Sequence, residues 1–143
     1  MFMFKGGDLF SLPFVPEQEI FKEVTINSAG LKVEVANTKA KRSKGLSGRA
    51  ALPENEGLLF LFPEPGRNPF WMKELKFPLD FIWIKGDNVV DLLENVPVPA
   101  AGVKDADLPI YTPKEDADKV LELNAGAIQK YNIKVGDTFT IEQ

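Results

Sequence analysis

The sequence contains no cysteine and no histidine. The absence of both residues excludes a thiolate nucleophile, a disulfide and a zinc site built from their side chains. No imidazole is present to act as a general base near neutral pH. Any catalysis would have to use carboxylates, amines, guanidinium groups or hydroxyls, and any metal would have to be a hard cation held by oxygen. We therefore expect no cofactor and no transition metal.

Long hydrophobic runs are also missing. No apolar stretch approaches the length needed to cross a membrane. The first 16 residues are rich in apolar side chains, but they are interrupted by Lys5, Gly6, Gly7 and Asp8. This segment therefore lacks the continuous apolar region of a signal peptide. The compartment stays open between the cytoplasm and export with a leader that is absent from this sequence.

Positive charge is scarce overall but is concentrated in one stretch. The net charge is −4, which argues against a general nucleic-acid binder, because such proteins present a positive surface to phosphates. Residues 36–53 contain no acid and five cations, so the rest of the chain has an excess of nine negative charges. These cations are Lys39, Lys41, Arg42, Lys44 and Arg49. The stretch could bind an anion, but a solvated helix face is the interpretation that we favour.

Turn residues are plentiful in this chain of 143 residues, with 11 prolines and 11 glycines. Such punctuation favours short strands over long helices, and the length suits one domain. Residues 1–18 are predicted to form an extended, phenylalanine-rich arm, and residues 19–143 a single globular domain. We expect the arm to dock on the domain or on a neighbouring molecule.

Runs of apolar or alternating residues predict the strands. The first two should pair as a hairpin across the turn at residues 27–30, and the run at 57–62 should be buried on both faces. Pro63, Pro65 and Gly66 are expected to end that buried run. The predicted strands are 20–26, 31–35, 57–62, 81–84, 89–96, 119–123 and 138–141.

Two short helices are expected between these strands. Thr38 is placed to cap a helix over residues 39–44, and Gly45 to end it with left-handed backbone. A second helix is predicted over residues 127–131, with Asn132 closing it. The fold class is therefore mostly β (α+β), with a small closed or strongly bent antiparallel, barrel-like sheet and two short helices.

Several motifs resemble those of a known family. They run in order over roughly residues 31–141, and comprise Val33-Glu34-Val35-Ala36, Gly45-Leu46 with Arg49, Gly57-Leu58-Leu59-Phe60, Phe70-Trp71-Met72-Lys73, Pro78-Leu79-Asp80, Val120-Leu121-Glu122-Leu123 with Ala125-Gly126, and Gly136-Asp137. Together they resemble the conserved family known as domain of unknown function 192.

The resemblance implies no activity and no catalytic residues, since the family has neither established. Its members often follow an export signal, so the resemblance raises export for this chain. One departure is Glu74-Leu75, where the family typically has Asn-Thr after the Met-Lys pair.

An aromatic residue and two charges gather around the central motifs. Trp71 could form a flat platform, with Lys73 and Asp80 as polar groups at a pocket mouth, an arrangement that suits a sugar or a small anion. The alternative is core packing by Trp71 and Met72, with Lys73 exposed.

Arg49, Asp80 and Glu122 are single charges inside otherwise apolar motifs. Because burying an unpaired charge is costly, we expect Arg49 to pair with Asp80 or Glu122. A structural ion pair is one interpretation. The other is a ligand-binding or catalytic role, in which two carboxylates and a cation perform acid–base hydrolysis.

The remaining polar residues match no known pattern for a metal site or a catalytic nucleophile. The acidic residues around the loop at 97–113 match no EF-hand spacing, so a solvated loop is expected rather than a calcium site. They are Asp105, Asp107, Glu115, Asp116 and Asp118. None of the serines that we considered has a nucleophile-elbow context or a histidine partner; they are Ser11, Ser28, Ser43 and Ser47.

Three functions stay open on the sequence. The first is a non-catalytic binding or accessory domain for a small polar ligand, either a sugar or an anion, with no nucleic-acid partner. Its expected ligand-binding residues are Arg49, Trp71, Lys73, Asp80 and Glu122. The second is a small hydrolase that uses carboxylates, and the third is a structural or interaction module that uses the arm. The oligomeric state is left open.

Overall fold

The predicted strand segments form one seven-stranded sheet in the computed structural model, which describes residues 18–142. The predicted arm at 1–18 lies outside the described residues except for its last position. The strands are β1 (Phe21–Ile26), β2 (Ala29–Ala36), β3 (Glu56–Gly66), β4 (Leu79–Lys85), β5 (Asn88–Val96), β6 (Ala117–Asn124) and β7 (Phe139–Ile141). No helix among these residues is long and apolar enough to cross a membrane.

The order of strands across the sheet is β5-β4-β6-β3-β2-β1-β7. The predicted hairpin of β1 and β2 is confirmed. We expected an antiparallel sheet, and β2 and β3 instead run parallel to each other. Parallel neighbours need a crossover connection, and the segment between them contains a helix, α1 (Lys39–Lys44), that provides it. The sheet is therefore mixed, while the predicted class of a strongly bent β sheet with two short helices is confirmed.

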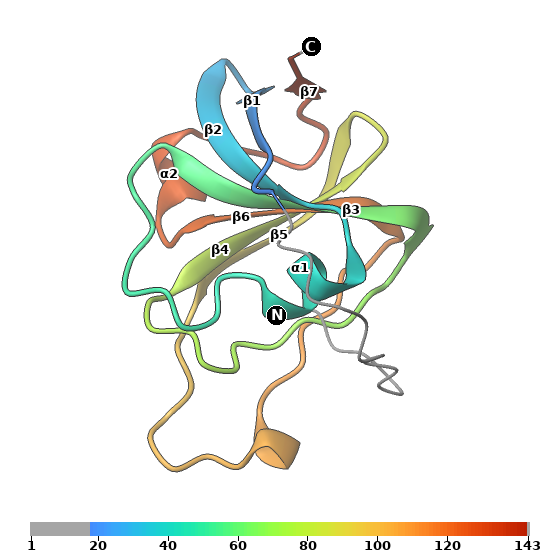
Figure 1. Cartoon of the computed structure of the whole chain (residues 1–143). Helices are drawn as coiled ribbons and strands as arrows, with labels where there is room; N and C mark the ends of the chain where they lie inside the picture. The colour runs from blue at the N-terminus through green and yellow to red at the C-terminus, as the bar shows by residue number, and fades with distance from the viewer. Residues whose placement is uncertain (1–17, 143) are drawn as a thin grey trace.

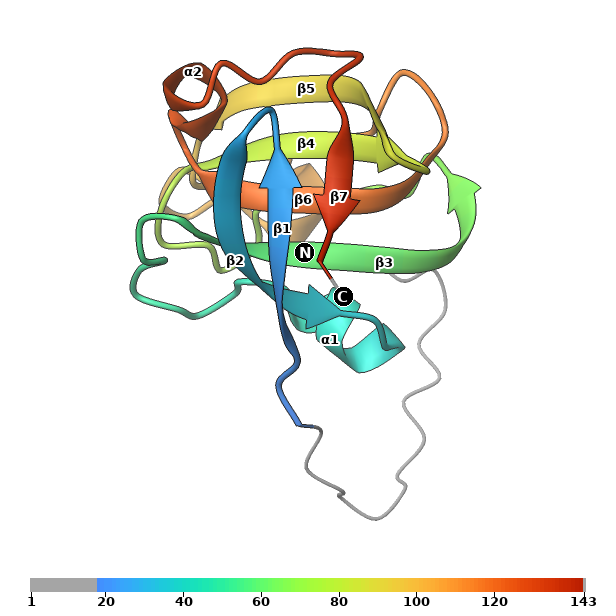
Figure 2. The same cartoon turned by 90° about the horizontal axis from the view of Figure 1, so that it is seen from above.

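The sheet bends into a half-barrel (Figures 1 and 2). In Figure 2, β1, β2 and β7 cross over the layer formed by β3, β6, β4 and β5. The two ends of the sheet meet at one corner, where the Phe139 N–H donates to the Asp87 carbonyl at 2.7 Å and the Val89 N–H to the Asp137 carbonyl at 2.9 Å. These bonds use backbone groups that an open edge would leave unpaired.

Helix α1 has the predicted termini. The Lys41 N–H donates to Thr38 Oγ1 at 3.2 Å, and Gly45 follows with φ 52°. The second helix, α2 (Ala127–Lys130), is followed by Asn132 with φ 53°, the left-handed conformation expected for it. In Figure 1, α1 and α2 lie on different sides of the sheet, and the long connection from β5 to β6, with a 3₁₀ turn at Asp105–Asp107, extends away from the body.

Apolar residues form a core on each face of the central strands. Alternation along β3 places Leu58 and Phe60 on the face that carries Leu46. It places Leu59 on the opposite face, which carries α2. Leu61 is half-buried, whereas many apolar residues of the strands are buried; these include Val33, Val35, Leu59, Phe81, Trp83, Leu121, Leu123 and Phe139. We refer below to these two faces as the α1 face and the α2 face.

Strand β3 is longer than predicted. It continues through Pro63 and Pro65 to Gly66, although these residues were expected to end it. Its pairing with β6 is irregular between Leu61 and Gly66. The two prolines are tolerated there, because proline, which lacks an N–H, is accommodated at irregular or edge positions of a sheet.

Candidate functional site

Arg49 lies on the connection from α1 to β3, and its partner is not the predicted one. Its Nη2 atom donates to Glu34 Oε2 at 2.7 Å, so the expected pairing with Asp80 or Glu122 is wrong. Glu34 belongs to β2, next to β3, and its side chain is only 15% exposed. Glu34 lies on the α1 face, and the contact with Arg49 helps to cover it there.

Asp80 is fully buried. Its pairing with Leu123 of β6 places it on the α2 face. Its carboxylate accepts three backbone N–H bonds, from Asn95 at 2.8 Å, from Ile128 at 2.9 Å and from Gly126 at 3.1 Å. These donors come from the end of β5 and the start of α2. Asp80 is therefore satisfied by backbone and holds two connections together, away from Arg49.

Glu122 is fully buried on the opposite, α1 face. Glu34, Leu58 and Glu122 lie in one register row across β2, β3 and β6, and Phe81 of β4 continues the row. Among the described residues, neither oxygen of the Glu122 carboxyl has a hydrogen-bond partner. Burial raises the pKa of this carboxyl to about 8, and the positive charge of Arg49 opposes that rise. Glu122 is therefore a protonated acid at neutral pH.

Trp71 and Lys73 do come together. The Lys73 Nζ atom lies 5.4 Å from the centroid of the Trp71 ring and 2.7 Å from Asp105 Oδ2. The hydrogen bond and charge of Asp105 raise the pKa of Lys73. Trp71 is half-buried, and Met72 is buried as the packing interpretation required. The cation of Lys73 is thus already engaged by an acid from the long loop.

The Trp71–Leu75 segment lies against the connection that carries Arg49. Ser47 Oγ donates to the Lys73 carbonyl at 3.1 Å, and the Gly48 N–H donates to the Glu74 carbonyl at 2.9 Å. Glu74 has φ 61°, a left-handed conformation in which Asn is strongly favoured over Glu. The departure from the family pattern at this position therefore concerns backbone conformation.

A hollow of about 200 Å³ opens beside the Arg49–Glu34 pair. Of the five predicted site residues, only Arg49 lines it. The lining residues are Glu19, Phe21, Lys32, Glu34, Arg49, Leu52, Pro53, Glu56 and Gly57. Phe21 is 46% exposed, and Lys32 Nζ lies 4.8 Å from its ring centroid and 3.9 Å from Glu56. Sequence reasoning missed these residues, because an exposed aromatic next to alternating charges looks like an ordinary strand.

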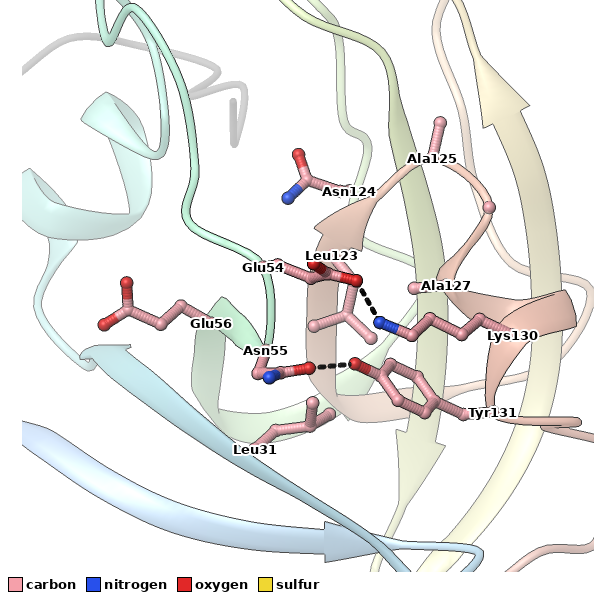
Figure 3. Close-up of a pocket in the computed structure, with 11 residues that line it drawn as sticks. Leu31, Glu54, Asn55, Glu56, Leu123, Asn124, Ala125, Ala127, Lys130 and Tyr131 are labelled. Atoms are coloured by element: carbon pink, nitrogen blue, oxygen red, sulfur yellow. Dashed lines mark hydrogen bonds and ion pairs between the residues drawn. The ribbon is translucent and has the colours of Figure 1, made fainter.

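A second hollow, of about 180 Å³, lies between α2 and the residues before β3 (Figure 3). Lys130 and Tyr131 reach from α2 across it, where Lys130 forms an ion pair with Glu54 and the Tyr131 hydroxyl donates to Asn55 Oδ1. These polar side chains pair with one another, and Leu31 and Leu123 contribute apolar lining. The arrangement attaches α2 to the loop before β3, and nothing in the sequence motifs signalled it.

The basic stretch is largely engaged in internal contacts. Lys41 Nζ donates to the Gln18 carbonyl at 2.7 Å, and Arg42 Nη1 donates to the Leu61 carbonyl at 2.9 Å. The Arg42 guanidinium also lies 5.3 Å from the Phe62 ring centroid. With Arg49 bound to Glu34, three of the cations support the α1 face and do not form a free anion site.

Two solved structures share this fold. One is a protein from Sinorhizobium meliloti 1021, provisionally described as a transcription regulator, with a TM-score of 0.78 and 26% sequence identity over 89% of this chain and 98% of that one. The other is a protein of unknown function from Novosphingobium aromaticivorans DSM 12444, with a TM-score of 0.71 and 30% identity over 85% of this chain and 84% of that one. No curated protein matches the chain.

The model of domain of unknown function 192, described as an uncharacterized conserved family, matches residues 22–141. This match covers every strand except the first residue of β1. The chain belongs to the family domain of unknown function 192.

Proposed function

We propose that this domain binds a small, neutral, polyhydroxylated ligand such as a sugar in the hollow beside Arg49, and that it does so without catalysing a reaction. The observation that carries the proposal is the half-buried Arg49–Glu34 pair next to the exposed ring of Phe21. A planar guanidinium and a carboxylate offer fixed donors and acceptors to hydroxyl groups, and an aromatic face packs against the C–H face of a sugar ring.

The charges of the hollow favour a neutral ligand over an anion. Lys32 and Arg49 are its two cations, and each has a carboxylate partner in the lining. Glu19 adds a third acid, so the lining carries an excess of one negative charge. An anion would meet repulsion there, whereas hydroxyl groups can bridge the paired charges. At about 200 Å³ the hollow is below the roughly 300–1,000 Å³ of drug-sized sites, so it suits a single small unit.

The hydrolase alternative loses its candidate pair of acids. Asp80 and Glu122 lie on opposite faces of the sheet, and both side chains are fully buried. Two carboxylates that act on one glycosidic bond must flank it in a shared cleft. Asp80 is in addition occupied by three backbone donors.

The Sinorhizobium protein is provisionally described as a transcription regulator, and DNA binding is one role that such a description allows. The net charge of −4 does not support that role here. Lys41, Arg42 and Arg49 are also held in internal contacts, which leaves fewer cations to displace counterions from phosphates.

A titration of the ¹⁵N-labelled protein with monosaccharides tests the proposal. Neutral hexoses at millimolar concentration should shift the Phe21 amide and the Arg49 Nε–Hε signals, while inorganic phosphate should not. Phe21→Ala should abolish the shift of the Arg49 Nε–Hε signal, and Arg49→Lys should abolish the shift of the Phe21 amide. Ile110→Ala, which removes a similarly exposed apolar side chain from the long loop, is the matched control and should leave binding intact. Shifts caused by phosphate alone, or no response to any sugar, would overturn the proposal.

A further inference from the structure

The row that contains Glu34, Leu58 and Glu122 places two carboxylates on one face, with one strand between them. Adjacent strands lie about 4.8 Å apart, so the backbone positions of these acids are roughly 10 Å apart. Arg49 is bound to Glu34 at 2.7 Å, and its charge also acts on Glu122. The guanidinium of Arg49, on its long flexible side chain, can therefore bind either Glu34 or Glu122.

The two acids differ in their need for Arg49. Glu34 is 15% exposed, so water can solvate its charge when Arg49 leaves. Glu122 is fully buried among Leu58, Phe81 and other apolar residues and has no hydrogen-bond partner among the described residues. A buried carboxylate without a partner is far more costly than an exposed one. Once Glu122 is charged, the pairing of Arg49 with it becomes the more favourable one.

The other charged groups nearby are committed elsewhere. Arg42 of α1 also belongs to this face, but its Nη1 atom is bound to the Leu61 carbonyl. Lys73 is paired with Asp105. Asp80 lies on the opposite face of the sheet. Leu58 and Phe81, the row neighbours of Glu122, are apolar. Within residues 18–142, Arg49 is thus the cation that we expect to respond to Glu122.

We propose that Glu122 is a buried proton-binding residue that controls which carboxylate Arg49 binds, and so the shape and charge of the hollow beside Arg49. While Glu122 is protonated, Arg49 stays on Glu34. Loss of the proton draws Arg49 to Glu122 and frees Glu34. The exchange breaks the O–H bond of the Glu122 carboxyl, transfers its proton to solvent and leaves the electron pair on the carboxylate; no other covalent bond changes. Its effect on ligand binding rests on the proposed function, whereas the exchange itself does not.

The exchange can be measured on the free protein by NMR. The Glu122 side-chain carboxyl and the Arg49 Nε–Hε group are followed from roughly pH 6 to pH 10, on both sides of the raised midpoint. Both signals should move with one common midpoint. In Glu122→Gln the Arg49 transition should disappear. An Arg49 signal that does not follow the Glu122 carboxyl would overturn the proposal, whether or not a sugar binds.

Two variants at the exposed end of the row make the test independent of whether Glu122→Gln folds. Arg49→Gln removes the opposing charge, so the Glu122 midpoint should rise by roughly one unit. Glu34→Gln removes the competing acid, so Arg49 should move to Glu122 and lower that midpoint by a similar amount. Equal midpoints in the two variants would overturn the proposal. If sugar binding is also observed, its affinity should change at the same midpoint and be independent of pH in Glu122→Gln.

Discussion

Glu122 makes the stability of the protein depend on pH. Its pKa is about 8 in the folded state and 4.5 in its ordinary, solvated state, so between these values the folded state binds more protons than the unfolded state. Stability should therefore fall as pH rises through this window and level off above it. The loss is about 1.4 kcal/mol per pH unit, on the order of 5 kcal/mol in all.

Glu122→Gln cannot titrate, so its stability relative to the parent protein should grow across the same window and stay constant outside it. Urea melts of both proteins between pH 5 and pH 9, the window on either side of neutrality, measure this difference. A difference that is independent of pH would show that the Glu122 carboxyl is not buried as a neutral acid.

We expect Asp80 to stabilise the fold and to take no part in ligand binding. Asp80→Ala leaves three backbone N–H donors without their acceptor; the Ile128 donor is buried and those of Asn95 and Gly126 are part-buried. A buried unsatisfied donor costs about 1–3 kcal/mol, and the costs are not additive. We expect a loss of roughly 3–5 kcal/mol in a denaturant melt. Asp80→Asn keeps one acceptor oxygen and should lose less. A cost below about 1 kcal/mol would contradict the role of Asp80 as an anchor for α2.

Glu74 is the residue at which a substitution should stabilise the protein. Its φ of 61° is unfavourable for a side chain with a long stem. Glu74→Asn should raise the free energy of unfolding by about 0.5–1 kcal/mol, and Glu74→Gly should also relieve the strain at some cost in chain entropy. Glu115→Asn, at an exposed position without positive φ, is the control and should change little. Thermal melts of the three variants measure this difference, and equal melting temperatures for Glu74→Asn and Glu115→Asn would contradict it.

At the scale of elements, Gly57 allows β3 to pack between its neighbours. A Cβ atom at this position would lie 2.6 Å from Leu123 Cδ2 and 2.7 Å from the Glu122 carbonyl oxygen. Gly57→Ala should therefore cost about 1–3 kcal/mol through overpacking, because the backbone oxygen cannot move aside easily. Gly30→Ala in β2, where nothing lies within 4 Å of the added atom, is the matched control and should be close to neutral. Equal melting temperatures of the two variants would contradict this account.

The elements show what the sequence could predict. Capping by Thr38, the glycine after α1 and the alternation in β2 are local signals, and each led to the correct element. The parallel pairing of β2 with β3 was missed because pairing depends on the route of the chain between strands. The partner of Arg49 was missed for the same reason. Register, and not the sequence around a residue, decides that Glu34 and Glu122 share a face while Asp80 lies on the other.

At the scale of the whole molecule, the lack of cysteine and histidine leads to a prediction about metals. No group of three or more acidic residues within residues 18–142 is placed to hold a metal ion. The melting temperature should therefore be the same with and without a strong chelator. A drop on chelation that is restored by one divalent cation would show that oxygen ligands hold a structural metal.

The pairing of β7 with β1 brings distant parts of the chain together. The Glu142 N–H donates to the Glu23 carbonyl at 2.9 Å, and Val24 is in register with Ile141. A linker of a few residues could thus join the two strands, and the chain could be reopened between Gly102 and Val103, in the exposed loop outside the sheet. Such a circular permutant keeps every strand pairing. By the same geometry, the domain can be inserted into a surface loop of another protein, because its entry and exit points are adjacent.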